Sequence, residues 1–360
     1  MSAPPNPVRH VAVAVPARNE EEHLPACLAA LDRAAERYRG PVTLFVLANH
    51  CDDATIPILR RTRLHHARLR WAAVSLLPGA RHAGWARRLA LDGAAACLGH
   101  PTDVLATTDA DTLVEPRWIE RTAVHVDRGA EALAGRVLTR RAERVALGAA
   151  AMGRLNLLER YCTAIEWLRA DREVVGDDPW PRHYYEGGAS LALTLNLYRR
   201  IGGAPTPSVG EDRALFAAAV AARARVRHPL DVRVFTSIRT EGRAPGGVAD
   251  VFAHWLAQPD DLPLHETYAV PAMLEPELAR EEDKLSFQTL PDALATARAL
   301  IRARQSEAAV LQQQRMGRID HPPHRAWEDE AVRRSGDAPA ELGAVTAESP
   351  TLQAAPPAHG

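Results

Sequence analysis

Up to Thr108 the chain alternates between short apolar runs and segments with helical spacing, and this alternation limits the fold more than any other feature. The apolar runs are predicted to be strands, because runs of this length with few polar residues fit a sheet covered on both faces. The alternation predicts an α/β fold with a doubly wound, mostly parallel sheet flanked by helices, which binds ligands at the carboxyl ends of its strands. The predicted strands are Val8–Val15, Val42–Leu47, Arg70–Leu76 and Asp103–Thr108, and the predicted helices between them are Glu20–Tyr38, Asp52 to about His66, and Gly84–Leu98.

Beyond Ala130 the alternation is less regular. The predicted elements are strands at Glu131–Val137 and Ala189–Leu195, a strand or hairpin at Val226–Ser237, and helices at Arg140–Arg172, Gly210–Arg223 and Leu290–Gln314. From about Gly336 the residues are mostly Ala, Pro, Gly and Glu, which predicts a disordered tail. The predicted organisation is a flexible N-terminus (1–7), an α/β domain (8–258) with halves 8–112 and 113–258, a helical C-terminal extension (259–335) and the disordered tail (336–360).

Composition narrows the classes of protein. The formal net charge is −1, so bulk electrostatics predict no nucleic-acid partner. All but one of the 44 basic residues are Arg, the exception being Lys284, so a single Arg is weak support for a site. The four Cys residues show no metal or disulfide spacing, and neither a signal segment nor a transmembrane stretch is apparent. We expect a cytoplasmic protein, with peripheral membrane contact left open.

Two carboxylates follow the fourth predicted strand in Asp-x-Asp spacing, as Asp109 and Asp111. Side chains at positions i and i+2 project from the same side of an extended chain, so both can reach one hard cation. The sequence therefore predicts a Mg²⁺ or Mn²⁺ site that would in turn bind a diphosphate. The alternative is an Asp-rich turn that caps the following helix.

Polar residues also follow the first two predicted strands. The first strand ends in Pro16-Ala17-Arg18-Asn19-Glu20, where a following helix N-terminus would present backbone N–H groups to a nucleotide. The alternative is a capping box, with Asn19 as the cap and Glu22 three residues later. After the second strand, Asn49 or Asp52 is a candidate to contact a base or ribose, and helix capping is again the alternative.

Taken in order along Val8–Gly247, these features resemble glycosyltransferase family 2, whose members have the GT-A fold. The family's P-x-x-N-E is present as Pro16–Glu20, its Asp-x-Asp as Asp109 and Asp111, and its E-D-x-x-L as Glu211–Leu215. One departure is the turn after the second strand, where the family usually has Asp-Asp-Gly-Ser and this chain has Asn49-His50-Cys51-Asp52-Asp53.

The resemblance implies a donor site in the half 8–112 and an acceptor site in the half 113–258. Asp111 would bind the cation directly, and Asp109 would bind the ribose, or the cation through water. The other implied donor contacts are Pro16, Ala17, Arg18 and Glu20, Asn49 or Asp52, Arg81 and Arg87, Gly187 and Gly188, and Arg239 and Arg243 in a loop that closes over the diphosphate.

The resemblance also implies the reaction. Asp212 would be the general base that deprotonates an acceptor hydroxyl, with Glu211 beside it, and the sugar would be transferred from a nucleotide-diphosphate donor with inversion. The acceptor is not specified by the sequence. Two alternatives stay open: a non-catalytic sugar-nucleotide-binding protein, and a sugar-phosphate nucleotidyltransferase. The second usually has a Gly-rich, Lys-containing loop after its first strand, and Pro16–Glu20 contains neither residue.

Overall fold

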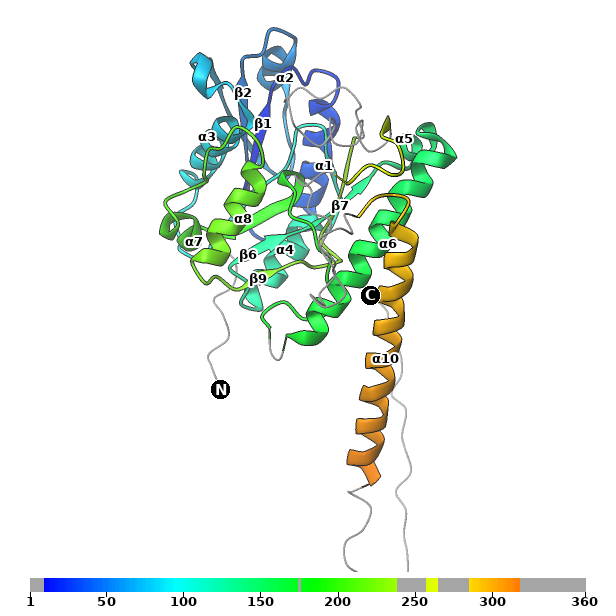
Figure 1. Ribbon diagram of the computed structural model, residues 1–360. Helices are drawn as coiled ribbons and strands as arrows, with labels where there is room; N and C mark the ends of the chain where they lie inside the picture. Colours follow the sequence, from blue (N-terminus) through cyan, green and yellow to red (C-terminus); the bar gives the residue numbers. More distant parts are fainter. Residues whose placement is uncertain (1–9, 174–175, 238–256, 265–284, 318–360) are drawn as a thin grey trace, which may run out of the picture. The chain divides into compact units, whose positions relative to one another are not determined.

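The computed structural model describes residues 10–173, 176–237, 257–264 and 285–317 (Figure 1). The chain divides into two compact units, Met1–Ala303 and Arg304–Gly360. Helix α10 (Leu290–Gly317) contains the division between them. The predicted flexible N-terminus and disordered tail lie outside the described residues, as do Arg239 and Arg243.

A seven-stranded sheet forms the centre of the first unit, in the order β3-β2-β1-β4-β8-β6-β9. The first four strands in this order are mutually parallel, as predicted, whereas β8 is antiparallel to both of its neighbours, β4 and β6. The strands are β1 (Val11–Ala17), β2 (Val42–Asn49), β3 (Arg68–Val74), β4 (Val104–Thr107), β6 (Ala132–Ala134), β8 (Leu191–Thr194) and β9 (Val226–Arg227).

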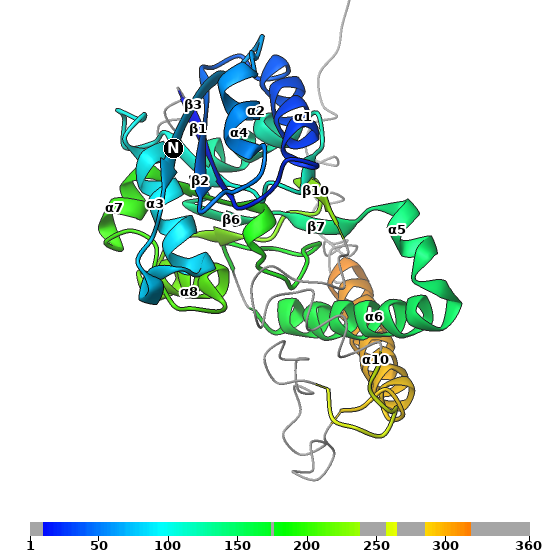
Figure 2. The same cartoon turned by 90° about the horizontal axis from the view of Figure 1, so that it is seen from above.

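Both faces of this sheet are covered, which explains the nearly continuous apolar runs in the sequence. Along β1, Val11, Val13 and Val15 enter one core cluster, while Ala12 and Ala14 enter the other. The first cluster includes α1 (Leu24–Glu36), α2 (Thr55–Arg61) and α4 (Trp118–Asp127), and the second includes α3 (Ala83–Ala95), α7 (Leu195–Arg200) and α8 (Glu211–Ala221). Figure 2 shows α1 and α4 on one side of the strands and α3 and α8 on the other.

A second sheet of three strands joins β5 (Leu113–Val114), β10 (Arg233–Thr236) and β7 (Arg136–Thr139), with β10 in the middle. Two predicted single elements are therefore divided between the two sheets. The predicted strand Glu131–Val137 separates into β6 and β7 at Gly135, where a Cβ atom would lie 2.1 Å from Ser190 Oγ. The predicted strand or hairpin Val226–Ser237 separates into β9 and β10.

Helix boundaries differ from prediction for local reasons. The second helix ends at Arg61 instead of about His66, because buried Asp32 accepts the backbone N–H groups of the next turn, residues 65–67, at 2.8–3.0 Å. The predicted Arg140–Arg172 helix is broken into α5 (Arg141–Ala146) and α6 (Gly148–Arg172), with Gly148 at φ +83°. Helix α4 was not predicted.

Part of the predicted C-terminal extension packs onto α6. Tyr161 and Ile165 of α6 and Leu290 of α10 are completely buried, and Phe287 joins the same apolar cluster. The first turns of α10, up to Ala303, therefore belong to the core of the first unit. The predicted domain boundary at 258/259 stays a prediction.

Candidate active site

The loops after β1 and β2 are joined by reciprocal hydrogen bonds. Asn19 Nδ2 donates to Asp52 Oδ1 at 2.5 Å, and the backbone N–H of Asp52 donates to Asn19 Oδ1 at 3.0 Å. Glu21 N–H donates to Asp53 Oδ2 at 3.0 Å, and Ala54 N–H donates to Glu21 Oε2 at 2.8 Å. The two polar motifs that follow the first two strands are thus complementary halves of one paired loop.

This pairing corrects the capping interpretation of Asn19. Helix α1 begins at Leu24 with His23 as its N-cap, and no side chain makes a capping hydrogen bond there. Asn19 has a φ of +53°, a left-handed conformation that Asn tolerates better than most residues. Its side chain is used to hold the second loop, so it makes no helix cap.

The predicted nucleotide contacts after β1 and β2 lie along this paired loop. Pro16 and Ala17 end β1, Arg18 is exposed, and Glu20 is buried, with its backbone N–H donating to Thr55 Oγ1 at 2.8 Å.

Asn49 and Asp52 follow β2 and differ in environment. Asn49 is 5% exposed, and its Oδ1 has no hydrogen-bond partner among the described residues. Asp52 is exposed and shares Oδ1 with Asn19. A buried acceptor without a partner is costly, so the Oδ1 of Asn49 suits a ligand donor better than it suits an apolar neighbour.

Asp109 and Asp111 lie directly after β4. The Asp109 side chain is 36% exposed, and its Oδ1 accepts from Arg87 Nη2 at 2.9 Å. Burial raises the pKa of Asp109, the Arg87 guanidinium opposes this, and the charge of Asp111 adds to it. The carbonyl of Asp111 accepts a hydrogen bond from Arg140 Nη2, a residue that sequence reasoning did not select.

Asp109 and Asp111 are the candidate ligands for a divalent cation. Carboxylate oxygens are preferred ligands of Mg²⁺ and Mn²⁺. Asp111 is close enough to Asp109 for its charge to act on the Asp109 carboxylate. The described residues contain no group of three or more His, Cys, Asp or Glu side chains placed to hold a metal. The pair therefore fits a partial shell, which a diphosphate and water would complete.

Arg87 of α3 is buried between the two halves of the site. Its Nε donates to Glu211 Oε1 at 3.2 Å, and its Nη2 to Asp109 Oδ1 at 2.9 Å. Its Nη1 donates to Thr107 Oγ1 at 3.1 Å and to the carbonyl of Gly188 at 3.0 Å. The resemblance implied that Arg87 lies beside the base and phosphates, and in the structure four of its five N–H groups donate inside the protein.

Glu211 and Asp212 begin α8, directly after Gly210 at φ +73°. Glu211 is buried against Arg87, whereas Asp212 is partly exposed. Asp212 Oδ2 accepts the backbone N–H of Gly188 at 2.9 Å, and Oδ1 accepts that of Arg213 at 2.8 Å. These bonds fix the orientation of the carboxylate, and each oxygen keeps a second lone pair for a further donor.

The structure thus brings Asp109, Arg87, Gly188, Glu211 and Asp212 together at the carboxyl edge of β4. Arg81 is not among them: it is exposed, and its Nε donates to the carbonyl of Leu76 at 2.9 Å. The contribution of Asn19 could have been anticipated, because Asn is common at left-handed positions. No signal in an Arg-rich sequence would have selected Arg140.

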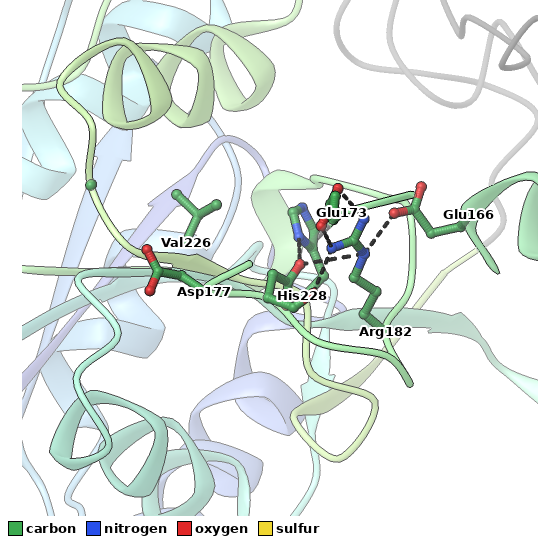
Figure 3. Close-up of a pocket in the computed structure, with 8 residues that line it drawn as sticks. Glu166, Glu173, Asp177, Arg182, Val226 and His228 are labelled. Carbon is green, nitrogen blue, oxygen red and sulfur yellow. Dashed lines mark hydrogen bonds and ion pairs between the residues drawn. The ribbon is translucent and has the colours of Figure 1, made fainter. Parts of the chain in front are cut away.

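A cavity of about 290 Å³ lies apart from these residues, between the end of α6 and β9 (Figure 3). Arg182 crosses it and pairs with Glu166 and Glu173, each at 2.7 Å. His228 lies at its edge, with Nδ1 2.7 Å from Asp178 Oδ2. None of the predicted site residues lines this cavity, so it is not the candidate active site.

Comparison with known proteins gives one sequence match. The model of the family described as glycosyltransferase like family 2 matches residues 5–176. No curated protein matches the chain. No helix among the described residues has the length and apolar character to cross a bilayer.

Three solved structures to which the chain is similar have TM-scores below 0.5. TarS of S. aureus in complex with UDP has 13% identity and a TM-score of 0.44, over 68% of this chain and 63% of that one. A mannosyltransferase from Pyrobaculum calidifontis in complex with GDP-Man and Mn²⁺ has 19% identity and a TM-score of 0.43, over 91% of this chain and 85% of that one. Glucosyl-3-phosphoglycerate synthase from Mycobacterium tuberculosis, in complex with Mn²⁺, UDP and phosphoglyceric acid, has 18% identity and a TM-score of 0.39, over 70% of this chain and 80% of that one.

The match to the S. aureus structures spans about 60% of their length, and matches with TM-scores this low support no conclusion about fold or function. The mixed α/β fold, with its mostly parallel sheet, agrees with the GT-A type expected from the resemblance. The resemblance to the family rests on the sequence match over residues 5–176. Over residues 5–176 the chain matches the model of glycosyltransferase like family 2, which confirms the resemblance expected from the motifs.

Proposed function

We propose that the protein transfers a sugar from a nucleotide-diphosphate donor to an acceptor hydroxyl. The observation that carries the proposal is the meeting of two carboxylate motifs at one place. Arg87 donates to both Asp109 and Glu211, although these two residues are far apart in the chain and Glu211 lies beyond the residues matched by the family. The geometry therefore supports a role for the Glu-Asp pair that the family match alone does not reach.

The donor nucleotide is proposed to bind along the paired loop after β1 and β2. Asn49 offers a buried acceptor for a base or ribose donor, and Asp52 offers the exposed carboxylate of the same loop. Asp109 and Asp111 would hold Mg²⁺ or Mn²⁺ together with the diphosphate. When bound, the cation supplies Lewis-acid neutralisation of the charge that develops on the leaving diphosphate.

Asp212 is proposed as the general base. It is partly exposed and its orientation is fixed by two backbone N–H groups, whereas Glu211 is buried and bonded to Arg87. Asp212 accepts the hydroxyl proton of the acceptor while the acceptor oxygen bonds to the anomeric carbon. The bond from that carbon to the diphosphate oxygen breaks, the nucleoside diphosphate leaves with the bonding electrons, and the sugar inverts.

A panel of sugar nucleotides with Mn²⁺ tests the proposal, with release of nucleoside diphosphate as the signal. Asp212→Asn should bind the donor with unchanged affinity and lose transfer by at least about 100-fold, since general bases contribute on the order of 10²–10⁴-fold. Asp171→Asn, which changes an exposed carboxylate of α6, is the matched control and should keep full activity. Donor binding without transfer by the unmodified protein would instead support a non-catalytic sugar-nucleotide-binding protein.

A further inference from the structure

We infer that Arg87 is a positioning residue, which holds the donor-side carboxylate Asp109 and the base-side helix residue Glu211 in register without touching the substrate. The inference rests on the proposed function, because the relative position of Asp109 and Glu211 matters only if they lie on the donor side and the base side of one active site. It also replaces the expectation that Arg87 contacts the base or phosphates.

The contacts of Arg87 bring four segments to one guanidinium. Thr107 ends β4, Asp109 belongs to the loop after it, Gly188 precedes β8, and Glu211 begins α8. A guanidinium is planar and directs its N–H groups along fixed lines, so these hydrogen bonds fix the relative positions of their acceptors in one plane. Lysine has a single charged centre and could not satisfy the same set.

Charge supports the same role. The Arg87 side chain is 7% exposed, and a cation this deep requires carboxylate partners, which Asp109 and Glu211 supply at 2.9 and 3.2 Å. Asp212 is also close enough to act on Arg87 electrostatically. Without the guanidinium, the negative charges of Asp109, Glu211 and Asp212 would repel one another, and Asp109 would move away from the start of α8.

Gly188 gives independent support. A Cβ atom on Gly188 would lie 2.2 Å from Arg87 Nη2 and 2.5 Å from Cζ. The absence of a side chain at Gly188 therefore makes room for the guanidinium, and the backbone of Gly188 both accepts from Arg87 and donates to Asp212. One residue thus connects the guanidinium to the proposed base.

The consequence concerns the free oxygen of Asp109. Arg87 binds Oδ1, whereas Oδ2 makes no hydrogen bond or ion pair with another described residue, so Oδ2 is the less constrained oxygen for a cation or ribose. Arg87 would then set the direction from which Asp109 meets its ligand. Changing Arg87 should weaken cation-dependent nucleotide binding and turnover together.

The test compares Arg87→Lys and Arg87→Met with Arg88→Met. Arg88 is the matched control: it is the next residue of α3, pairs with Asp92 at 2.7 Å and donates to the carbonyl of Ala204 at 2.9 Å, both outside the site. Calorimetry measures Mn²⁺ binding and the binding of UDP and of GDP with Mn²⁺, and unfolding midpoints are measured for every variant. These readouts need neither the donor sugar nor the acceptor.

Both Arg87 variants should weaken Mn²⁺-dependent diphosphate binding at least tenfold, and lysine should not rescue it. Arg88→Met should lower the unfolding midpoint while leaving this affinity within twofold. In a double-mutant cycle, Arg87→Met should add less to Asp109→Asn than it costs alone. If Arg87→Met fails to fold, the Mn²⁺-dependent diphosphate affinities of Arg87→Lys and Gly188→Ala test the inference in its place.

Folded Arg87 variants that bind diphosphate and Mn²⁺ as the unmodified protein does would overturn the inference. So would equal losses of affinity in the Arg87 and Arg88 variants, since a general structural role would affect both. Failure of the unmodified protein to transfer any sugar would refute the proposed function instead. In that case the binding comparison still measures what Arg87 does to Asp109.

Discussion

Raising the pH should destabilise the protein through one ion pair. Burial alone would lower the pKa of His228, but hydrogen bonds from its ring to Asp178 and Glu186, at 2.7 and 3.4 Å, raise it to about 9. The neighbouring His183 ring is 5.5 Å away, and burial lowers its pKa to about 3, so it stays neutral near neutral pH. His228 is therefore the charged partner of Asp178 at neutral pH.

The sign and size of the effect follow from linkage. The folded pKa of His228 lies above its ordinary value of 6.5, so its contribution to the free energy of unfolding is complete below pH 6.5 and disappears as the pH rises through about 9. The difference corresponds to about 3 kcal/mol, at roughly 1.4 kcal/mol for each pH unit. His228 is only 13% exposed, so solvent screens this pair weakly.

Urea denaturation at pH 6.5, 8 and 9.5 measures the effect, with His228→Gln as the reference. The unmodified protein should lose about 3 kcal/mol more than His228→Gln between the lowest and highest pH. The subtraction removes groups that titrate in both proteins. Parallel pH profiles for the two proteins would refute the assignment of a charged His228.

Two further predictions concern packing. Gly84→Ala should lose about 1–3 kcal/mol of unfolding free energy, because its Cβ would lie 2.2 Å from the carbonyl oxygen of Pro207. Gly99→Ala is the control and should change stability little, because a Cβ atom there meets open space. Unfolding midpoints in urea distinguish the two variants. Ile165→Ala should lose about 2–5 kcal/mol, because Ile165 is fully buried in the α6–α10 core, whereas Val145→Ala, 73% exposed, should stay within about 0.5 kcal/mol. Equal losses in the last pair would contradict this core.

The sequence predicts the first half of the sheet well for a physical reason. Strand β1 sends alternate residues into two separate apolar clusters, so both faces select apolar residues and the run is continuous. The short strands after Ala130 carry no such pattern. Their division at Gly135 depends on Ser190, a partner far along the chain, and no local signal reports it.

The candidate site shows the same limit. The order of motifs places Asp109 and Asp111 after a strand and Asp212 at a helix start, and the structure has them there. The order of motifs does not identify which Arg is buried, because nearly every basic residue in the sequence is Arg. The partners of Arg87 lie 20 to 124 residues away, and only the folded sheet brings them to one guanidinium. The roles assigned to the site residues stay predictions.

The most direct test of the account is calorimetry of nucleoside diphosphate binding, with and without Mn²⁺, in the unmodified protein and in Asp111→Asn. The account predicts that Mn²⁺ strengthens UDP or GDP binding at least tenfold in the unmodified protein. The same measurement on folded Asp111→Asn should show no such gain, since one carboxylate of the pair after β4 would be lost. Equal, Mn²⁺-dependent binding in both proteins would contradict the account.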